Sequence, residues 1–228
     1  MYVMWPVLVW AAALAKCVVP TTLVIIALVR SWFTVGTGTI AAEWTMESRF
    51  SDHSNTSSWF RTSPLKGITE SYGIKLHHVK PHGALNNMAC EDIELSTTIA
   101  KSICEISKDL IYLVPTGSKM EEAAKKLNMK IACEIFADRN YEDDGNLVSR
   151  KKPNALITDP EEAKKHVLSM VKNQALNCFS GKQIPCKIDS VCIHGDNESS
   201  LATAKSIKDN LISNGLELKP LNKMKKFN

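Results

Sequence analysis

Three short apolar runs in this sequence each end in a cluster of charged and imidazole side chains. The clusters are Val79-Lys80-Pro81-His82-Gly83-Ala84-Leu85, Glu134-Ile135-Phe136-Ala137-Asp138-Arg139 and Val191-Cys192-Ile193-His194-Gly195-Asp196. In folds that combine a parallel sheet with helices, functional side chains gather where the strands end. The repeated placement therefore predicts an α/β fold with an active site at its strand ends.

Residues 72–219 alternate strand-like and helix-like segments, as a parallel sheet covered by helices requires. We expect strands at 74–80, 110–115, 130–136, 155–158 and 188–194, and helices at 92–107, 118–127, 159–171 and 199–213. Several helix ends carry local signals: Ser118 with Glu121 forms a capping box, Asp159-Pro160 starts a helix, and Asn214-Gly215 ends one. This region is the predicted folded domain.

Residues 1–35 form an apolar segment whose first 29 residues carry a single charge, Lys16. A membrane-spanning helix needs about 20 apolar residues, and residues 7–29 are long enough to be one. Two hypotheses follow. Either this segment anchors a cytoplasmic domain to a membrane, or it is not part of the folded protein.

The regions on either side of the predicted domain are polar. Residues 36–71 are rich in Ser and Thr and lack a sustained apolar period, so we predict a linker there. Residues 220–228 carry Lys223, Lys225 and Lys226, and we predict a solvated basic tail.

Composition narrows the class of protein. The chain of 228 residues has a net charge of +4 and no basic stripe with interleaved aromatic residues, so nucleic-acid binding is not predicted. The seven cysteines include no C-x-x-C pair. We therefore expect free thiols, although Cys178 and Cys186 are spaced so that they could bridge a loop in an oxidising compartment.

The first cluster combines the Lys80 cation, the His82 imidazole and the backbone N–H of Gly83. Such groups stabilise a developing oxyanion or bind a carboxylate. The alternative is that both side chains are satisfied by neighbouring carboxylates and have only a structural role.

The second cluster offers Asp138 as a general base and Arg139 as a fork for a carboxylate, with Glu134 inside the preceding strand. The alternative is a surface ion pair. The third cluster offers His194 and Asp196. The alternative is a hydrogen-bonded core histidine and a helix N-cap made by Asp196 or Asn197. A metal site built from His82, Asp138, His194 and Asp196 is conceivable, but the spacing does not require one and no metal is assigned.

The remaining histidines of the predicted domain are not assigned to the site. His77 and His78 alternate faces of one strand, and we predict a structural role for both. His166 lies among lysines in a predicted helix, where we expect it to be exposed.

Four stretches together resemble the lactam-utilisation (LamB/YcsF) family, the A subunit of 5-oxoprolinase. They are His78-Val-Lys-Pro-His-Gly-Ala-Leu85, Glu134-Ile-Phe-Ala-Asp-Arg-Asn-Tyr-Glu-Asp-Asp-Gly-Asn-Leu-Val-Ser-Arg150, Ala155-Leu-Ile-Thr-Asp-Pro-Glu-Glu-Ala163 and Asp189-Ser-Val-Cys-Ile-His-Gly-Asp-Asn197. The resemblance implies a (β/α) barrel of the glycoside hydrolase/deacetylase type. It also implies ATP-dependent opening of 5-oxoproline to L-glutamate, with ATP used through partner subunits of the 5-oxoprolinase.

The resemblance also assigns roles to the clusters. Lys80 and His82 would handle the oxyanion or an activating phosphate, and Asp138 or Asp196 would position water. His194 would move protons. The substrate would contact Gly83, Glu134 and Arg139, the last through its carboxylate.

The sequence departs from the family in two ways. Asn86 stands where an aromatic residue usually follows the first motif, and the family's N-terminal motifs have no counterpart before Tyr72. We therefore expect an incomplete barrel. Two functions remain open: a 5-oxoprolinase component, or a non-catalytic half-barrel, membrane-tethered or free, that binds a partner or has no function.

Overall fold

The computed structural model describes residues 2–3, 26–28, 32–34, 54–194 and 200–228. The chain divides into two compact units, an N-terminal unit of residues 18–132 and a C-terminal unit of residues 133–228 together with 1–17. Each unit is described by itself.

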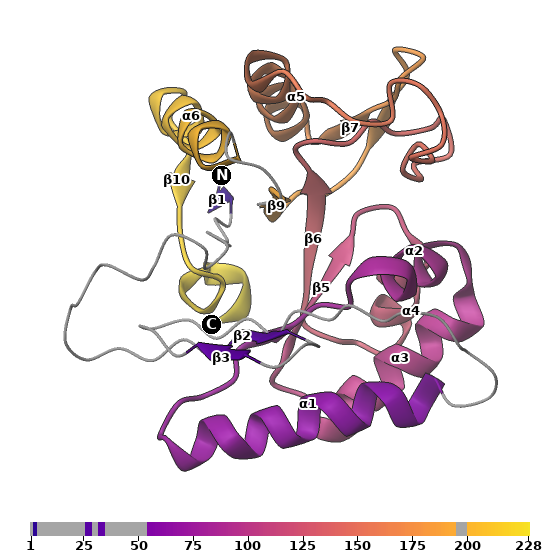
Figure 1. The fold of residues 1–228 in the computed structure, drawn as a ribbon, viewed down its shortest axis with the longest axis vertical. Coiled ribbons are helices and arrows are strands. Elements are labelled where there is room, and N and C mark those ends of the chain that lie inside the picture. The colour runs from indigo at the N-terminus through magenta and orange to yellow at the C-terminus, as the bar shows by residue number, and fades with distance from the viewer. Residues whose placement is uncertain (1, 4–25, 29–31, 35–53, 195–199) are drawn as a thin grey trace. The chain divides into compact units, whose positions relative to one another are not determined.

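The N-terminal unit is mainly helical around two parallel strands (Figure 1). Its elements are β2 (Ile26–Leu28), β3 (Trp32–Thr34), α1 (Ser54–Ser71), β4 (His78–Val79), α2 (Gly83–Glu91), α3 (Ile93–Ile106), β5 (Ile111–Pro115), α4 (Lys119–Lys126) and the start of β6 (Ile131–Phe136). β4 and β5 are parallel, with His78 opposite Ile111. β2 and β3 form a separate antiparallel pair.

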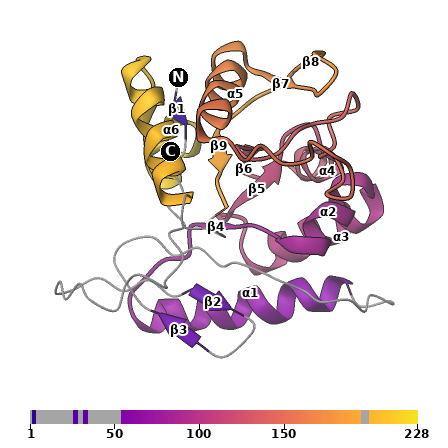
Figure 2. The same cartoon turned by 45° about the horizontal axis from the view of Figure 1, so that its top comes forward.

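Helix α1 corrects the linker predicted over residues 36–71, of which 36–53 lie outside the described residues. Residues 54–71 are helical, and the helix runs alongside α3 in both views (Figures 1 and 2). Among residues 62–71 of this helix, whose burial the structure describes, the buried positions are Thr62, Leu65 and Thr69. Because two of these are threonines, the buried face shows no apolar period in the sequence, and the composition alone pointed to a linker.

The predicted helices over 92–107 and 118–127 are present because local caps define their first turns. The Asp92 carboxylate accepts from the backbone N–H of Glu94 at 2.8 Å, and Ser118 Oγ accepts from that of Glu121 at 3.4 Å. Helix α2 was not predicted. It follows His82 directly, in a stretch we assigned to the first cluster.

The C-terminal unit holds the rest of β6 and the following elements: α5 (Pro160–Asn173), β7 (Ala175–Asn177), β8 (Gln183–Pro185), β9 (Ser190–Cys192), α6 (Ser200–Ser213), β10 (Glu217–Leu218) and the 3₁₀ turns η2 (Leu221–Lys223) and η3 (Lys225–Phe227), with β1 (Tyr2–Val3) paired to β10. β7 and β8 make an antiparallel hairpin that was not predicted. The strand expected at 155–158 is reduced to a single bridge between Arg139 and Leu156.

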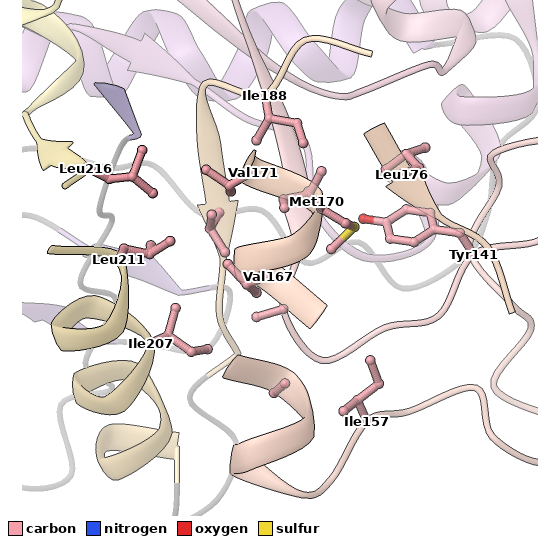
Figure 3. Close-up of a cluster of buried hydrophobic side chains, with 14 of the residues drawn as sticks. Tyr141, Ile157, Val167, Met170, Val171, Leu176, Ile188, Ile207, Leu211 and Leu216 are labelled. Atoms are coloured by element: carbon pink, nitrogen blue, oxygen red, sulfur yellow. The ribbon is translucent and has the colours of Figure 1, made fainter. Parts of the chain in front are cut away.

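The core of the C-terminal unit lies between β6, β9 and the two helices α5 and α6, which pack side by side (Figures 2 and 3). Fully buried members include Val167, Met170 and Val171 from α5 and Ile207 and Leu211 from α6. Each such side chain contributes about 1.5–3 kcal/mol when it leaves water. This core holds β6 and β9 in place.

The C-terminal tail is folded, which corrects the solvated tail predicted over 220–228. Leu221 and Met224 are buried. Lys226 Nζ donates to the Asp189 carboxylate, which also accepts from the backbone N–H of Cys133 at 2.9 Å. The lysines of this segment led to the prediction of a solvated tail. The two buried apolar residues lie three positions apart in a short turn, and two such residues do not make a recognisable apolar pattern.

The four strands β4, β5, β6 and β9 form one sheet in that order. The pairs given by register, β4–β5 and β6–β9, are parallel. With helices following the strands, this confirms the predicted α/β class. The incomplete barrel of the glycoside hydrolase/deacetylase type stays a prediction.

No helix within the described ranges is long and apolar enough to cross a membrane. Of the candidate span 7–29, residues 26–28 form β2, and residues 7–25 and 29 lie outside the described residues.

Candidate active site at the strand ends

The paired strands β6 and β9 have one apolar face and one polar face. Ile135, Ala137 and Val191 belong to the core beneath α5 and α6. The residues between them point the other way, because successive side chains of a strand alternate. The polar face therefore carries Glu134 together with the Phe136 ring, and Asp138 lies in the turn that follows β6.

A constant offset joins the two strands on this polar face. Glu134 pairs with Ser190, 56 residues later, and Ser190 Oγ donates to Glu134 Oε2 at 3.2 Å. The same offset of 56 joins Asp138 to His194. The parallel register thus continues past the ends of both strands and brings these two predicted site residues together.

The Asp138–His194 pair is the most defined chemical feature of the C-terminal unit. His194 Nδ1 lies 2.8 Å and 3.0 Å from the two carboxylate oxygens of Asp138. A carboxylate accepts, so Nδ1 donates, and Nε2 is the nitrogen that can take or give a proton. The side chains are 30% and 29% exposed, so the pair is reachable by a small molecule.

Two aromatic residues beyond the predicted site residues support this pair. The Phe136 ring stacks on the His194 imidazole, with centroids 5.8 Å apart and an interplanar angle of 10°. The Tyr141 hydroxyl accepts from the backbone N–H of Phe136 at 2.8 Å. The available signal was the spacing, because Phe136 ends the strand only two residues before Asp138.

Glu134 and Arg139 are both buried, with 1% and 5% of their surfaces exposed. Glu134 lies within the sheet against Ser190. Arg139 Nη2 donates to the carbonyl of Val148 at 2.6 Å, and Nε donates to that of Ala155 at 3.4 Å. Burial lowers the pKa of Arg139, and the nearby Arg150 lowers it further. Arg139 is therefore engaged with the loop that follows it.

The first cluster lies in the N-terminal unit, where β4 passes into α2. Lys80 is 8% exposed, and His82 is the residue before the helix. Gly83 has a φ of +63° and is exposed, as is Ala84. The first turn of α2 carries no acidic residue. Exposed N–H groups at a helix start, close in sequence to a cation, favour a negatively charged group.

Burial sets the electrostatics around this cluster. His78 is buried, and burial, followed by His77 and Lys80, lowers its pKa to about 4. The imidazole is therefore neutral at pH 7, as expected for a histidine with a structural role. Burial also raises the pKa of Cys90 to about 12, which keeps that thiol protonated and unreactive.

Asp196 lies outside the described residues, so its predicted role stays a prediction. Within the ranges that the structure describes, no three His, Cys, Asp or Glu side chains are grouped to hold a metal ion. The cysteines there are free thiols, including Cys178 and Cys186.

The exposed position predicted for His166 is wrong, because this side chain is half-buried. It stacks on Tyr141 with ring centroids 6.4 Å apart. Burial lowers its pKa.

Comparison with known proteins gives a consistent result. The family model described as "LamB/YcsF family" matches residues 55–226. The A subunit of 5-oxoprolinase from Clostridium beijerinckii is 44% identical over 165 residues, 72% of this chain and 65% of that protein. That of Campylobacter jejuni is 43% identical over 152 residues, 67% of this chain and 60% of that protein.

A solved structure also resembles this chain. The crystal structure of the lactam utilization protein from Thermus thermophilus matches with a TM-score of 0.72 and 28% identity, covering 80% of this chain and 77% of that one. The chain spans 60% and 65% of the length of the two curated relatives named above.

Proposed function

Because the chain belongs to the LamB/YcsF family, we propose that it is a component of a 5-oxoprolinase-type hydrolase. The proposed reaction opens the lactam ring of 5-oxoproline to give L-glutamate. Relatives named for 5-oxoprolinase, at 38–44% identity, support this substrate class. The observation that carries the proposal in this chain is the Asp138–His194 pair at 2.8 Å.

The pair suits the proton transfers that lactam hydrolysis requires. Asp138 holds Nδ1–H of His194, so Nε2 faces the reaction as a base. As the oxygen of a water molecule bonds to the lactam carbonyl carbon, Nε2 takes the water's proton. When the C–N bond breaks, Nε2 returns that proton to the ring nitrogen, and the product carries an amine and a new carboxyl group, whose remaining proton passes to the amine to leave ammonium and carboxylate.

The attack on the carbonyl places negative charge on its oxygen. We assign stabilisation of that charge to Lys80, His82 and the N–H of Gly83, because a cation and exposed helix N–H groups favour an anion. Asp196 is kept as a second group to position water. Glu134 is not assigned to substrate contact, because its side chain is 1% exposed and accepts from Ser190.

The resonance of the amide makes this hydrolysis slow, and we assign ATP to partner subunits that activate the substrate. The relatives are named as one subunit of 5-oxoprolinase, which supports partner subunits for this chain. The free thiols in the described part of the chain fit a reducing compartment, so we place the activity in the cytoplasm.

The test is an assay that follows 5-oxoproline conversion to glutamate with the full chain, ATP and candidate partner subunits. We expect glutamate only when chain, partner and ATP are all present. His82→Ala and Asp196→Ala should abolish turnover, while Lys151→Gln, at an exposed lysine, should retain it. Full activity in the His82 or Asp196 variant would remove that residue from the mechanism. No glutamate with any partner would reject the function.

A further inference from the structure

A loop of residues 147–157 is fastened to the segment that leaves β6. The backbone N–H of Val148 donates to the carbonyl of Asn140 at 2.9 Å, and that of Ile157 donates to the carbonyl of Asp138 at 2.9 Å. Asn140 Nδ2 donates to the carbonyl of Asn154 at 2.8 Å. The loop is thus bound at both ends and near its tip.

Arg139 supplies the charged contacts to this loop. Its guanidinium donates to the carbonyls of Val148 and Ala155, which flank the loop's exposed basic stretch. Hydrogen bonds from a charged donor contribute more to stability than bonds between neutral groups. A planar fork can hold two carbonyls in fixed directions, which a lysine cannot.

We propose that Arg139 is a positioning residue, whose guanidinium ties loop 147–157 to the strand exit and thereby fixes the Asp138 carboxylate on His194. Two contacts make the link. The carbonyl of Asp138 is held by the same loop through Ile157, and the Asp138 carboxylate is bonded to His194 Nδ1. The two neighbouring side chains serve different partners, because the Arg139 guanidinium contacts the loop while the Asp138 carboxylate contacts His194.

This role differs from the one that the resemblance implied for Arg139. A residue that binds the substrate carboxylate needs an accessible fork, whereas Arg139 is 5% exposed and donates to backbone carbonyls through Nε and Nη2. The proposal rests on the proposed function for its kinetic test, but its spectroscopic test does not.

The test compares three variants of the full chain. Arg139→Lys keeps the charge but loses the fork, and Asn140→Ala removes the separate side-chain bond to the loop. Lys151→Gln alters an exposed cation of the same loop and serves as the matched control. The readout is the Nδ1–H proton signal of His194 in ¹⁵N-histidine-labelled protein, assigned by its absence in His194→Gln.

In Arg139→Lys we expect the His194 signal to be lost or to shift toward its position in Asp138→Asn. In Asn140→Ala it should shift part of the way. In Lys151→Gln it should stay in place. In the glutamate assay, Arg139→Lys should lower kcat at least about 10-fold with KM within about 2-fold, as for a group absent from substrate binding. Thermal unfolding shows whether Arg139→Lys folds. If it does not fold, the His194 signal of Asn140→Ala tests the proposal.

An unchanged His194 signal in Arg139→Lys, with KM raised about 10-fold, would overturn the proposal and restore Arg139 as a substrate ligand. An unchanged His194 signal in both Arg139→Lys and Asn140→Ala would overturn the proposal without any kinetic data. If the wild-type chain forms no glutamate, the proposed function fails, while the proton signal still decides the positioning role.

Discussion

The exit of β6 and β9 and the exit of β4 look alike in the sequence but differ in the structure. Each is an apolar run followed by charged and imidazole groups. At the β6–β9 exit, a carboxylate and an imidazole are hydrogen-bonded to each other and about 30% exposed. At the β4 exit, Lys80 and His78 are buried, and a helix starts at an exposed glycine.

The same sequence pattern, an apolar run followed by charged and imidazole groups, therefore supports two kinds of chemistry. A partly exposed Asp–His pair can exchange protons with a substrate. A helix start beside a buried cation can instead hold negative charge. The neutral His78 strengthens this division, because at pH 7 its buried imidazole adds no charge at the β4 exit.

The largest effect that we expect is at the proton-exchanging exit. Asp138→Asn removes the carboxylate that fixes His194, so kcat for glutamate formation should fall about 100- to 10,000-fold. The midpoint of thermal unfolding should change little, because the side chain is 29% exposed. Asp109→Asn, at an exposed carboxylate in the other unit, is the matched control. A kcat within about threefold of wild type would exclude Asp138 from catalysis.

The second effect tests the buried histidine at the β4 exit. The pKa of His78 is about 4 in the folded chain against 6.5 for the ordinary group, so the unfolded chain binds more protons between these values. Stability should therefore fall as pH falls through this window, by about 2 kcal/mol from His78 between pH 7 and 5.

The check is the free energy of unfolding in urea at both pH values. In His78→Phe, the fall in the free energy of unfolding that His78 causes between pH 7 and 5 should be absent. His77→Gln, at the half-buried neighbour, should reduce the fall by less. Equal pH dependence in wild type and His78→Phe would show that His78 is not buried in neutral form.

The smallest effect concerns the start of α2. Gly83→Ala should destabilise the chain by about 1–2 kcal/mol, because a side chain is strained at a φ of +63°. The added Cβ would meet nothing within 4 Å, so strain is the whole cost. Gly67→Ala within α1 is the control, and it should stabilise by about 0.5–1 kcal/mol. Urea unfolding that gives the same sign for both variants would contradict this account.

Local signals explain what could be predicted. The helices beginning at Ile93, Lys119 and Pro160 have capping residues beside their first turns, and a cap acts within three residues. Helix α1 was missed because Thr62 and Thr69, two of its buried residues, are not apolar. The folded tail was missed because its anchor, Asp189, is 37 residues away from Lys226.

The sequence by itself determined the α/β class, the family and which residues belong to the strand exits, because strand alternation, caps and motifs depend on neighbours along the chain. Only the tertiary structure decided how those residues are used. The offset of 56 that pairs Asp138 with His194 comes from the register of two strands, and the burial of Arg139 comes from a loop that folds back over it. Register and burial depend on packing between distant segments, which local sequence patterns do not specify.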